Sequence, residues 1–353
     1  MKNGIERALG NLFLNWLEND GANFSGVFSV KREGMTIYQN SKGYRNKSEK
    51  LDILNDTKFA VASITKFFTS LSILKLAERK KLSVTDTLDD VLPYDLGKIN
   101  RQISIKQLLN HTSGVGDYTD DETEDIDAVF DKLYASYPSY LWTNMDYYLQ
   151  MSKDLEPKFN PGERMSYSNT GYVLLGLIIE KLSGVSYQEF VETEIIKPLN
   201  LLNTGFHRLD RLPGNTALGY IDELTTSIFS VPIIGGSDGG IFTTADDLDL
   251  LWRAVYGTEL ITEDSLKMLI GHKTLAYKNA LEQGDTIYYG LGLYLYETEN
   301  GVKFSYVAGY DAGADCISIY CPKNQITITV LSNVMDVAKY TLVKKAMEIF
   351  IKV

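Results

Sequence analysis

The sequence contains little cysteine and little histidine. Of its 353 residues two are cysteine, Cys316 and Cys321, and three are histidine, at positions 111, 207 and 272. The cysteines stand five residues apart in one strand-like run, so their side chains point to opposite faces of a strand and cannot bond to each other. The histidines are scattered, without the spacing of a metal-binding motif. We therefore expect neither a metal nor a cofactor.

Basic residues are also scarce. The formal net charge is −11 and the pI is about 4.9. Proteins that bind nucleic acids normally carry a basic surface, so we expect no nucleic-acid partner. The densest run of charge, residues 117–131, is acidic. We interpret it as a solvated loop, with a preference for cationic substrates as the alternative.

Long hydrophobic runs are absent. No stretch of about 18 apolar residues occurs, so we expect no membrane-spanning segment. The first apolar residues recur at helical spacing between charged ones, as in an amphipathic packing helix and unlike a signal peptide. They are Ile5, Leu9, Leu12, Phe13, Trp16 and Leu17. As it stands, the sequence predicts a cytoplasmic protein, whereas a chain whose export signal had been trimmed would be exported.

What the chain does contain is an ordinary globular composition, with 44% hydrophobic and 23% charged residues. Its length predicts two domains, or one core with a large insertion. Strand-like runs bounded by turn residues gather near both ends, and a helix is expected at each terminus. The expected strands are residues 26–30, 35–38, 304–309, 316–321 and 326–331, and the expected last helix is 336–351.

The middle of the chain has helical periodicity instead. Helices are expected over residues 104–110, 170–182, 186–194 and 244–256. We therefore predict an α+β fold in which an antiparallel β-sheet is flanked by helices. Residues 1–80 and 285–353 would form the sheet domain, and residues 81–284 a mostly helical inserted domain.

The first chemical motif is Ser63-Ile-Thr-Lys66, which follows a short apolar run. A serine at a helix start lies near free backbone N–H groups and the positive end of the helix dipole. Lys66, three residues on, projects from the same helix face, so a nucleophile and an amine are held together without a histidine. Ser72 and Lys75 repeat the spacing, but a mid-helix serine tends to bond a preceding carbonyl and is a poor nucleophile.

The second motif is Tyr167-Ser168-Asn169, just before the helix expected from residue 170. A tyrosine beside a lysine can act as base toward a serine hydroxyl, and either Tyr167 or neutral Lys66 could take the proton. Asn169 would orient the substrate, or cap the helix, or both. The same Tyr-x-Asn spacing at Tyr38 and Tyr44 falls in a strand end and a loop.

The third motif is Val307-Ala-Gly309-Tyr310, on an expected strand that ends in a turn at Gly313. The edge of this strand could bind the substrate backbone at Gly309. The N–H groups of Tyr310 and Ser63 could together form an oxyanion hole. An ordinary strand and turn is the alternative.

Together these motifs resemble the serine β-lactamase superfamily, in its branch of class C β-lactamases, DD-peptidases and esterases. The resemblance implies that Ser63 is the nucleophile, Lys66 and Tyr167 the acid–base pair, Asn169 a substrate contact, and the Ser63 and Tyr310 amides the oxyanion hole. It also implies an α/β domain with an inserted helical domain and the active site in the cleft between them. The matching segments are residues 59–66, 108–114, 161–169, 239–245 and 289–292.

One residue departs from the family pattern. The third motif of the family starts with Lys or His, and the register of Gly309 and Gly313 puts Val307 at that position. Valine donates no hydrogen bond to a carboxylate, so recognition of β-lactam or peptide carboxylates is in doubt. We expect a serine hydrolase that acts through an acyl-enzyme on esters or amides, with a small-molecule or peptide substrate.

Three alternatives stay open at this level. The run Gly235-Gly-Ser237-Asp-Gly239 fits the Gly-x-Ser-x-Gly motif of α/β-hydrolases, with His111 or His272 as a possible partner, although His111 is interpreted as structural. The same fold could also belong to a penicillin-binding or ligand-binding protein with little turnover. Finally, the tyrosine-rich stretch 134–148 either packs the helical domain or forms an aromatic cap over the cleft.

Overall fold

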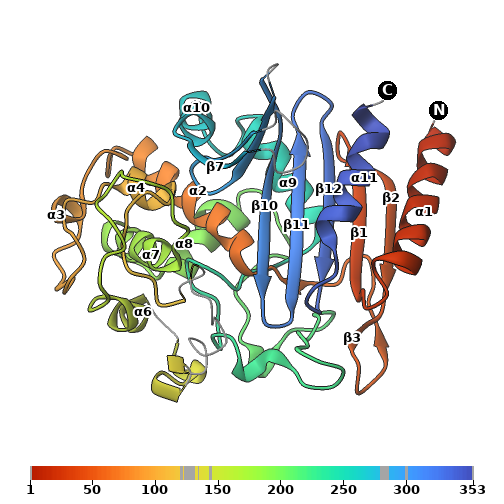
Figure 1. Ribbon diagram of the computed structural model, residues 1–353, viewed down its shortest axis with the longest axis horizontal. Helices are drawn as coiled ribbons and strands as arrows, with labels where there is room; N and C mark the ends of the chain where they lie inside the picture. The colour runs from red at the N-terminus through yellow and green to blue at the C-terminus, as the bar shows by residue number, and fades with distance from the viewer. Residues whose placement is uncertain are drawn as a thin grey trace.

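The protein is built around an eight-stranded antiparallel sheet, in the order β2-β1-β12-β11-β10-β9-β8-β7 (Figure 1). The computed structural model describes residues 2–119, 122, 132–133, 135–142, 145–278, 286–298 and 301–351. The strands are β1 (Gly26–Arg32), β2 (Met35–Lys42), β7 (Thr274–Lys278), β8 (Thr286–Tyr289), β9 (Tyr294–Thr298), β10 (Gly301–Asp311), β11 (Ala314–Cys321) and β12 (Ile326–Ser332).

The two ends of the chain meet inside this sheet. Strand β1 pairs with β12, from Gly26 opposite Ser332 to Arg32 opposite Ile326. The predicted α+β fold with an antiparallel sheet is therefore confirmed. Strands β7, β8 and β9 were not predicted. The division into two domains stays a prediction, and β7, which precedes residue 285, lies at the edge of the sheet.

One face of the sheet is covered by the terminal helices α1 (Lys2–Asn19) and α11 (Lys339–Ile351), which lie side by side (Figure 1). The helical spacing of Leu9, Phe13 and Trp16 buries all three against this face. This confirms the amphipathic packing helix, because side chains at i, i+4 and i+7 share one helix face.

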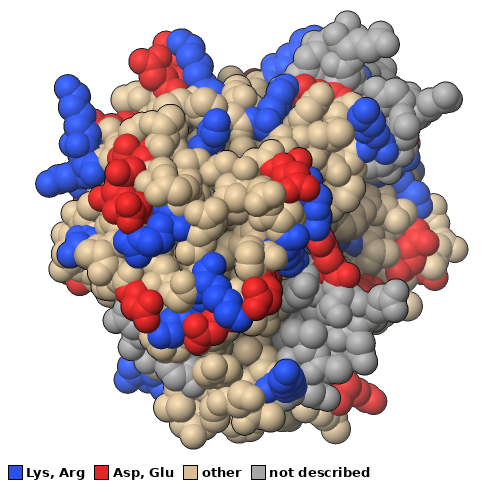
Figure 2. Space-filling model, turned by 60° about the vertical axis from the view of Figure 1, so that its left-hand side comes forward, with Lys and Arg blue, Asp and Glu red and all other residues tan. Residues whose placement is uncertain are grey.

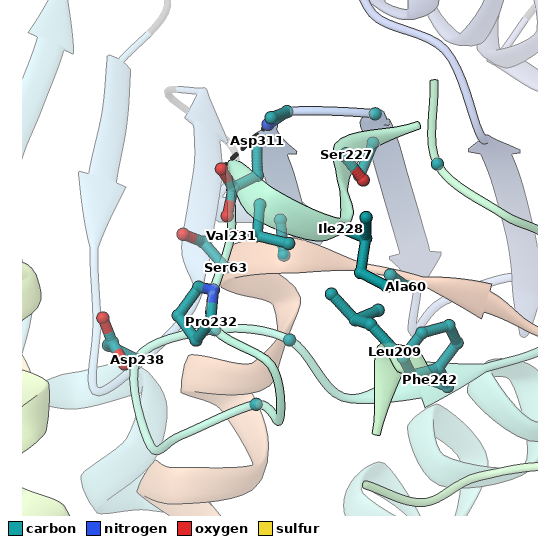
Figure 3. A pocket seen from close by; sticks show the side chains of 18 of the residues that line it. Ala60, Ser63, Leu209, Ser227, Ile228, Val231, Pro232, Asp238, Phe242 and Asp311 are labelled. Carbon is teal, nitrogen blue, oxygen red and sulfur yellow. Dashed lines mark hydrogen bonds between the residues drawn. The ribbon is translucent and has the colours of Figure 1, made fainter. Parts of the chain in front are cut away.

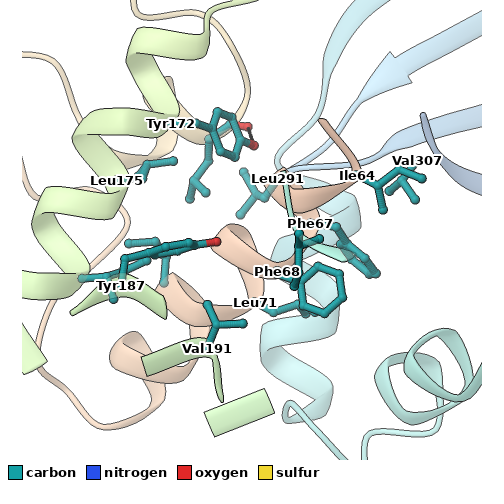
Figure 4. Packing of buried hydrophobic residues seen from close by; sticks show 14 of the residues in the cluster. Ile64, Phe67, Phe68, Leu71, Tyr172, Leu175, Tyr187, Val191, Leu291 and Val307 are labelled. Carbon is teal, nitrogen blue, oxygen red and sulfur yellow. Dashed lines mark hydrogen bonds between the residues drawn. The ribbon is translucent and has the colours of Figure 1, made fainter. Parts of the chain in front are cut away.

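The other face is covered by the inner helices. Helix α2 (Thr65–Glu78) is buried almost all round, and α7 (Asn169–Ser183), α8 (Tyr187–Val191) and α9 (Ala245–Tyr256) pack in the same core (Figure 4). The predicted helix 186–194 ends at Val191 and continues as a π-helical turn, Glu192–Ile196. The remaining α-helices of the described residues are α3 (Leu88–Val91), α4 (Ile105–Leu109), α6 (Met145–Ser152) and α10 (Glu263–Gly271).

The two cysteines lie on opposite faces of strand β11, as predicted. Cys316 belongs to the core under the inner helices and Cys321 to the core under α1 and α11. Both are buried free thiols. Burial raises the pKa of each thiol to about 12, because the charged thiolate is poorly solvated there.

The surface carries charge of both signs. On the face in Figure 2, Lys and Arg side chains are interspersed with Asp and Glu. Among the helices of the described residues, none is long and apolar enough to span a membrane. The cellular location stays a prediction.

Candidate active site

Ser63 lies on a tight turn between a short strand and the central helix. Strand β5 (Phe59–Ala60) pairs with β6 (Phe242–Thr243) and leads into the 3₁₀ turn η1 (Ala62–Ile64), which precedes α2. Ala62 has a φ of 45°, a left-handed conformation that costs about 1–3 kcal/mol for a residue with a side chain. The hydroxyl of Thr65 donates to the carbonyl of Ala62 at 2.6 Å and holds this conformation. Ser63 is thus presented on a braced, strained turn.

Lys66 is a buried amine with acceptors from three separate segments. Its side chain is 1% exposed. Nζ donates to Ser63 Oγ at 3.1 Å, to Asn169 Oδ1 at 2.6 Å and to the carbonyl oxygen of Asp238 at 2.6 Å. An ammonium has three N–H donors, and each of these contacts lies within hydrogen-bond distance. The structure therefore brings together the serine and lysine of the first motif.

Tyr167 lies beside this amine. Lys66 Nζ is 4.9 Å from the centre of the Tyr167 ring. The ring of His111 packs on the same tyrosine, with centroids 4.2 Å apart. Tyr167, Ser63 and Asn169 all line one pocket. The second motif thus converges on the first, as the sequence predicts.

His111 holds the backbone on both sides of Tyr167. Its Nδ1 accepts the N–H of Ser168 at 3.1 Å, and its carbonyl accepts the N–H of Ser166 at 2.9 Å. Burial, assisted by the charge of Lys66, holds the pKa of His111 well below its usual value, so the imidazole is neutral. These contacts agree with the structural interpretation of His111.

Asn169 begins α7 but does not cap it. The cap is Ser168, whose hydroxyl accepts the N–H of Gly171 at 3.0 Å. The side chain of Asn169 instead bridges Lys66 and Thr119, and its Nδ2 donates to Thr119 Oγ1 at 2.6 Å. Both groups of the amide are therefore directed into the candidate site.

Asp117, the first residue of the acidic run, is buried, so for this residue the interpretation as a solvated loop is wrong. Its carboxylate is buried and accepts the N–H groups of Asn169 at 2.7 Å and Thr170 at 3.1 Å. Burial raises the pKa of Asp117, and these two bonds oppose that rise. Free N–H groups at a helix start attract a carboxylate, which is why this residue is buried. Of residues 120–131, all except Glu122 lie outside the described residues.

The two alternative serines, Ser237 and Ser72, form hydrogen bonds with backbone carbonyls. Ser237 is buried, and its hydroxyl donates to the carbonyl of Tyr172 at 2.8 Å. The hydroxyl of Ser72 donates to the carbonyl of Phe68 at 2.8 Å, as expected for a mid-helix serine. The glycine-rich loop around Ser237 supplies instead the Asp238 carbonyl that binds Lys66. Neither serine is placed as a nucleophile.

Strand β10 passes very close to the Ser63 turn at Gly309. A side-chain carbon added to Gly309 would lie 2.1 Å from the carbonyl oxygen of Val61 and 3.0 Å from the amide nitrogen of Ser63. Only glycine allows this approach. Tyr310, the next residue, is 52% exposed and lines the pocket.

Val307 is a predicted substrate-binding residue whose side chain does not reach the pocket. Its side chain is 3% exposed and lies beside Ile64 in the core (Figure 4). Strand alternation turns Val307 and Gly309 to one face, and that face is covered here by the Ser63 turn. Val307 therefore contributes packing under the nucleophile, without lining the pocket.

The pocket next to Ser63 is a cavity of about 150 Å³ with one apolar end. In Figure 3, Ala60, Leu209, Ile228 and Phe242 gather at that end, while Ser63 lies towards the other. The segment 209–232 that supplies much of this wall carries no motif, and the sequence did not predict a role for it.

The predicted aromatic cap is represented by two residues of the pocket wall, Trp142 and Tyr148. They contact each other edge to face, with centroids 5.5 Å apart, and both are buried. Tyr140, in contrast, is 60% exposed. Tyr134 and the side chain of Tyr147 lie outside the described residues. Whether the stretch caps a bound substrate stays a prediction.

Comparison with known proteins identifies the family. The Beta-lactamase family profile matches residues 15–346. The chain belongs to the Beta-lactamase family. Penicillin-binding protein 4* from Bacillus subtilis (strain 168) is 31% identical over 336 residues, which cover 90% of this chain and 70% of that protein. Matches to other curated relatives cover as little as 58% of their length.

Two solved structures of this fold are similar over nearly the whole chain. A penicillin-binding protein from Bacillus halodurans is 33% identical with a TM-score of 0.82, covering 94% of this chain and 98% of that one. A D-stereospecific amidohydrolase from Streptomyces is 25% identical with a TM-score of 0.76, covering 98% of each. This member of the Beta-lactamase family is a serine hydrolase, and a ligand-binding protein without turnover is not favoured.

The close approach of β10 to the Ser63 turn gives a first prediction. In Gly309→Ala the new methyl group must push the strand away from Val61 and Ser63. A displacement of about 1 Å at a reacting centre costs about 10²-fold in rate, so we expect kcat/KM for an ester to fall by about that factor. Gly214→Ala, where a methyl group meets nothing within 4 Å, is the matched control. Ester hydrolysis and thermal unfolding of both variants measure this, and wild-type turnover in Gly309→Ala would contradict it.

Proposed function

We propose that the protein hydrolyses small esters or amides through an acyl-enzyme on Ser63, with Lys66 and Tyr167 as the proton-transfer pair. The observation that supports this most is the contact of Lys66 Nζ with Ser63 Oγ at 3.1 Å, beside the ring of Tyr167. Asn169 and Gly309 would contact the substrate next to Ser63. If neither Lys66 nor Tyr167 accepted the proton of Ser63, the same site would bind a substrate without turning it over.

The proposed reaction has two steps. Ser63 Oγ attacks the carbonyl carbon while its proton passes to the Lys66–Tyr167 pair, and the pair then protonates the departing alcohol or amine. Water next attacks the acyl-serine ester and loses its proton to the same pair. The pair returns this proton to Ser63 Oγ as the ester bond breaks and the acid leaves. Lys66 stays anchored by Asn169 and Asp238 throughout, so the amine keeps its position.

The negative oxygen of the tetrahedral intermediate would be stabilised by two backbone N–H groups, those of Ser63 and Tyr310. The short distance between Gly309 and the amide of Ser63 supports this pairing. Backbone donors held by a turn and a strand need no rearrangement when the charge develops, which is why such pairs accelerate acyl transfer.

The size and charge of the pocket favour an apolar substrate without a carboxylate. A cavity of about 150 Å³ is comparable with one that holds a benzene molecule, so it fits a short acyl chain or one small ring. The lining residues that the structure describes include the carboxylates Asp238 and Asp311 and neither Lys nor Arg. Like charge repels a substrate carboxylate there. Similarity to the Streptomyces amidohydrolase supports amides among the substrates.

The nucleophile can be tested directly. A fluorophosphonate probe should label Ser63, because covalent acylation is the expected first step. Peptide mapping of the adduct identifies the labelled residue. Ser63→Ala should abolish labelling, whereas Ser72→Ala should keep it because the Ser72 hydroxyl is bound to the carbonyl of Phe68. Label on Ser237 or Ser72 would refute the assignment.

The proton-transfer pair gives a separate prediction. Lys66→Ala and Tyr167→Phe should each lower kcat by at least ~10², since positioned proton transfer contributes about 10²–10⁴-fold. The double variant should lose little more than either single one, because both residues serve one proton path. Lys75→Ala and Tyr44→Phe, which alter the repeated spacings away from the pocket, are matched controls with wild-type kcat. Near-wild-type turnover by Tyr167→Phe would show that Tyr167 is not part of the path.

The substrate class is tested by chain length and by charge. Wild-type kcat/KM for p-nitrophenyl butyrate should exceed that for nitrocefin by at least ~10-fold, because a charged group left without its hydrogen bond loses about 1.5–3 kcal/mol. Ile228→Trp should fill the apolar end and lower kcat/KM for the butyrate about tenfold while leaving the acetate within about threefold.

The neighbouring Phe229 supplies the control for this experiment. It is 78% exposed and does not line the pocket, so Phe229→Trp should hydrolyse both esters like the wild type. A wild-type preference for nitrocefin would mean that another residue anchors the carboxylate, and the proposed substrate class would be wrong.

A further inference from the structure

A buried ion pair lies behind the sheet, at the strand that borders the candidate site. Lys339, at the start of α11, is 4% exposed and forms a salt bridge with the buried Asp315 on β11. Two charges removed from water lose hydration, and a buried pair is often no more stable than apolar residues of the same size. Stability alone therefore does not explain why an ion pair is buried at this position.

The ammonium of Lys339 also donates to the carbonyl oxygen of Gly309 at 2.9 Å. This carbonyl and the N–H of Tyr310 belong to one peptide unit. The chain has no cis peptide among the described residues, and in a trans peptide the C=O and N–H point in opposite directions. With the carbonyl turned to Lys339, the N–H of Tyr310 turns away from α11.

The opposite edge of β10 faces the nucleophile. Strand β10 pairs with β9 only as far as Tyr306, so beyond that residue this edge is not paired with β9. There Gly309 lies against the Ser63 turn, and both Ser63 and Tyr310 line the pocket. The peptide unit thus has the ammonium at one end and the pocket at the other.

We propose that Lys339 is a positioning residue that orients and polarises the Gly309–Tyr310 peptide, so that the N–H of Tyr310 is a stronger oxyanion donor. This rests on the proposed function, which assigns that N–H to the oxyanion hole. A cation on the carbonyl draws electron density from the amide and strengthens the bond that its N–H donates, as in other hydrogen-bonded chains. No proton is transferred to or from Lys339.

The segment before Lys339 is held in one place by the same two strands. The N–H of Val337 donates to Asp315 Oδ2 at 3.0 Å, and the hydroxyl of Tyr310 donates to Asp336 Oδ1 at 3.0 Å. Asp336 and Ala338 both have left-handed backbones, with φ of 55° and 50°, which non-glycine residues adopt only when the surroundings hold them there. The ammonium is therefore delivered to Gly309 by a rigid segment.

The test removes the charges while keeping the volume. Lys339→Met/Asp315→Asn leaves no unpaired ion, so its circular dichroism should match the wild type. A phenylboronic acid, which adds to the serine oxygen as a tetrahedral anion, reports on the oxyanion hole. We expect the double variant to bind the phenylboronic acid about tenfold more weakly than the wild type. Its kcat for p-nitrophenyl butyrate should also fall about tenfold, while its KM stays within about twofold. A rise in KM with unchanged kcat would overturn the proposal.

Two variants separate this effect from a merely structural one. Asp315→Asn alone removes the carboxylate charge but keeps a side-chain oxygen that accepts from the ammonium. The ammonium then stays on Gly309, and this variant should retain the boronate affinity. Arg253→Met/Asp249→Asn removes another pair with a buried carboxylate, joined at 3.0 Å, and should bind the boronate like the wild type. An equal loss in Asp315→Asn, or in the Arg253 control, would overturn the proposal.

The wild-type protein distinguishes this inference from the proposed function. Wild-type Ser63 should react with fluorophosphonate. If it does, and the folded Lys339→Met/Asp315→Asn variant has unchanged boronate affinity, only the role of Lys339 is overturned. Ser63 that takes up no probe overturns the proposed function and, with it, the role of Lys339.

Discussion

The buried amine of Lys66 is the constraint on which the candidate site depends. An amine that is 1% exposed needs hydrogen-bond partners inside the protein, since a buried polar group without them is destabilising. Here the acceptors come from the Ser63 turn, the start of α7 and the loop at Asp238. Those segments are far apart in the sequence, so the amine is satisfied only when all three have come together.

The residues around the Lys66 amine are in turn fixed by further hydrogen bonds. Asp117 binds the backbone of Asn169, and the hydroxyl of Tyr118 binds the carboxylate of Asp238. His111 holds the backbone on both sides of Tyr167. A second layer of this kind restricts the site to one arrangement, which is what catalysis by preorganised groups requires.

The sheet contributes in a different way. Strand β10 brings Gly309 against the Ser63 turn, and the ion pair of Lys339 and Asp315 lies on the carbonyl of that glycine. The strained residue Ala62 lies on the turn. Strain of this sort persists only where packing on several sides prevents its release. The two cores, one on each face of the sheet, provide that packing.

Much of this could be predicted from the sequence, because it depends on residues close together in the chain. The pairing of Ser63 with Lys66 follows from helical spacing, the opposite faces of Cys316 and Cys321 from strand alternation, and the packing face of α1 from its apolar periodicity. The strands near both termini were also predicted, since their patterns are local. Strands β7, β8 and β9 were not predicted; of these, β7 is the edge strand of the sheet, and none of its side chains is fully buried.

The rest was decided only by tertiary structure. Asp117 is buried because a helix start more than 50 residues away offers it free N–H groups. Val307 occupies the position of a family site residue, yet the Ser63 turn covers its face of the strand. The Asp238 carbonyl and the Lys339 ammonium carry no sequence signal at all, because any residue has a carbonyl and most lysines are exposed. Local spacing determined which groups could react, and contacts between distant segments determined how they are held.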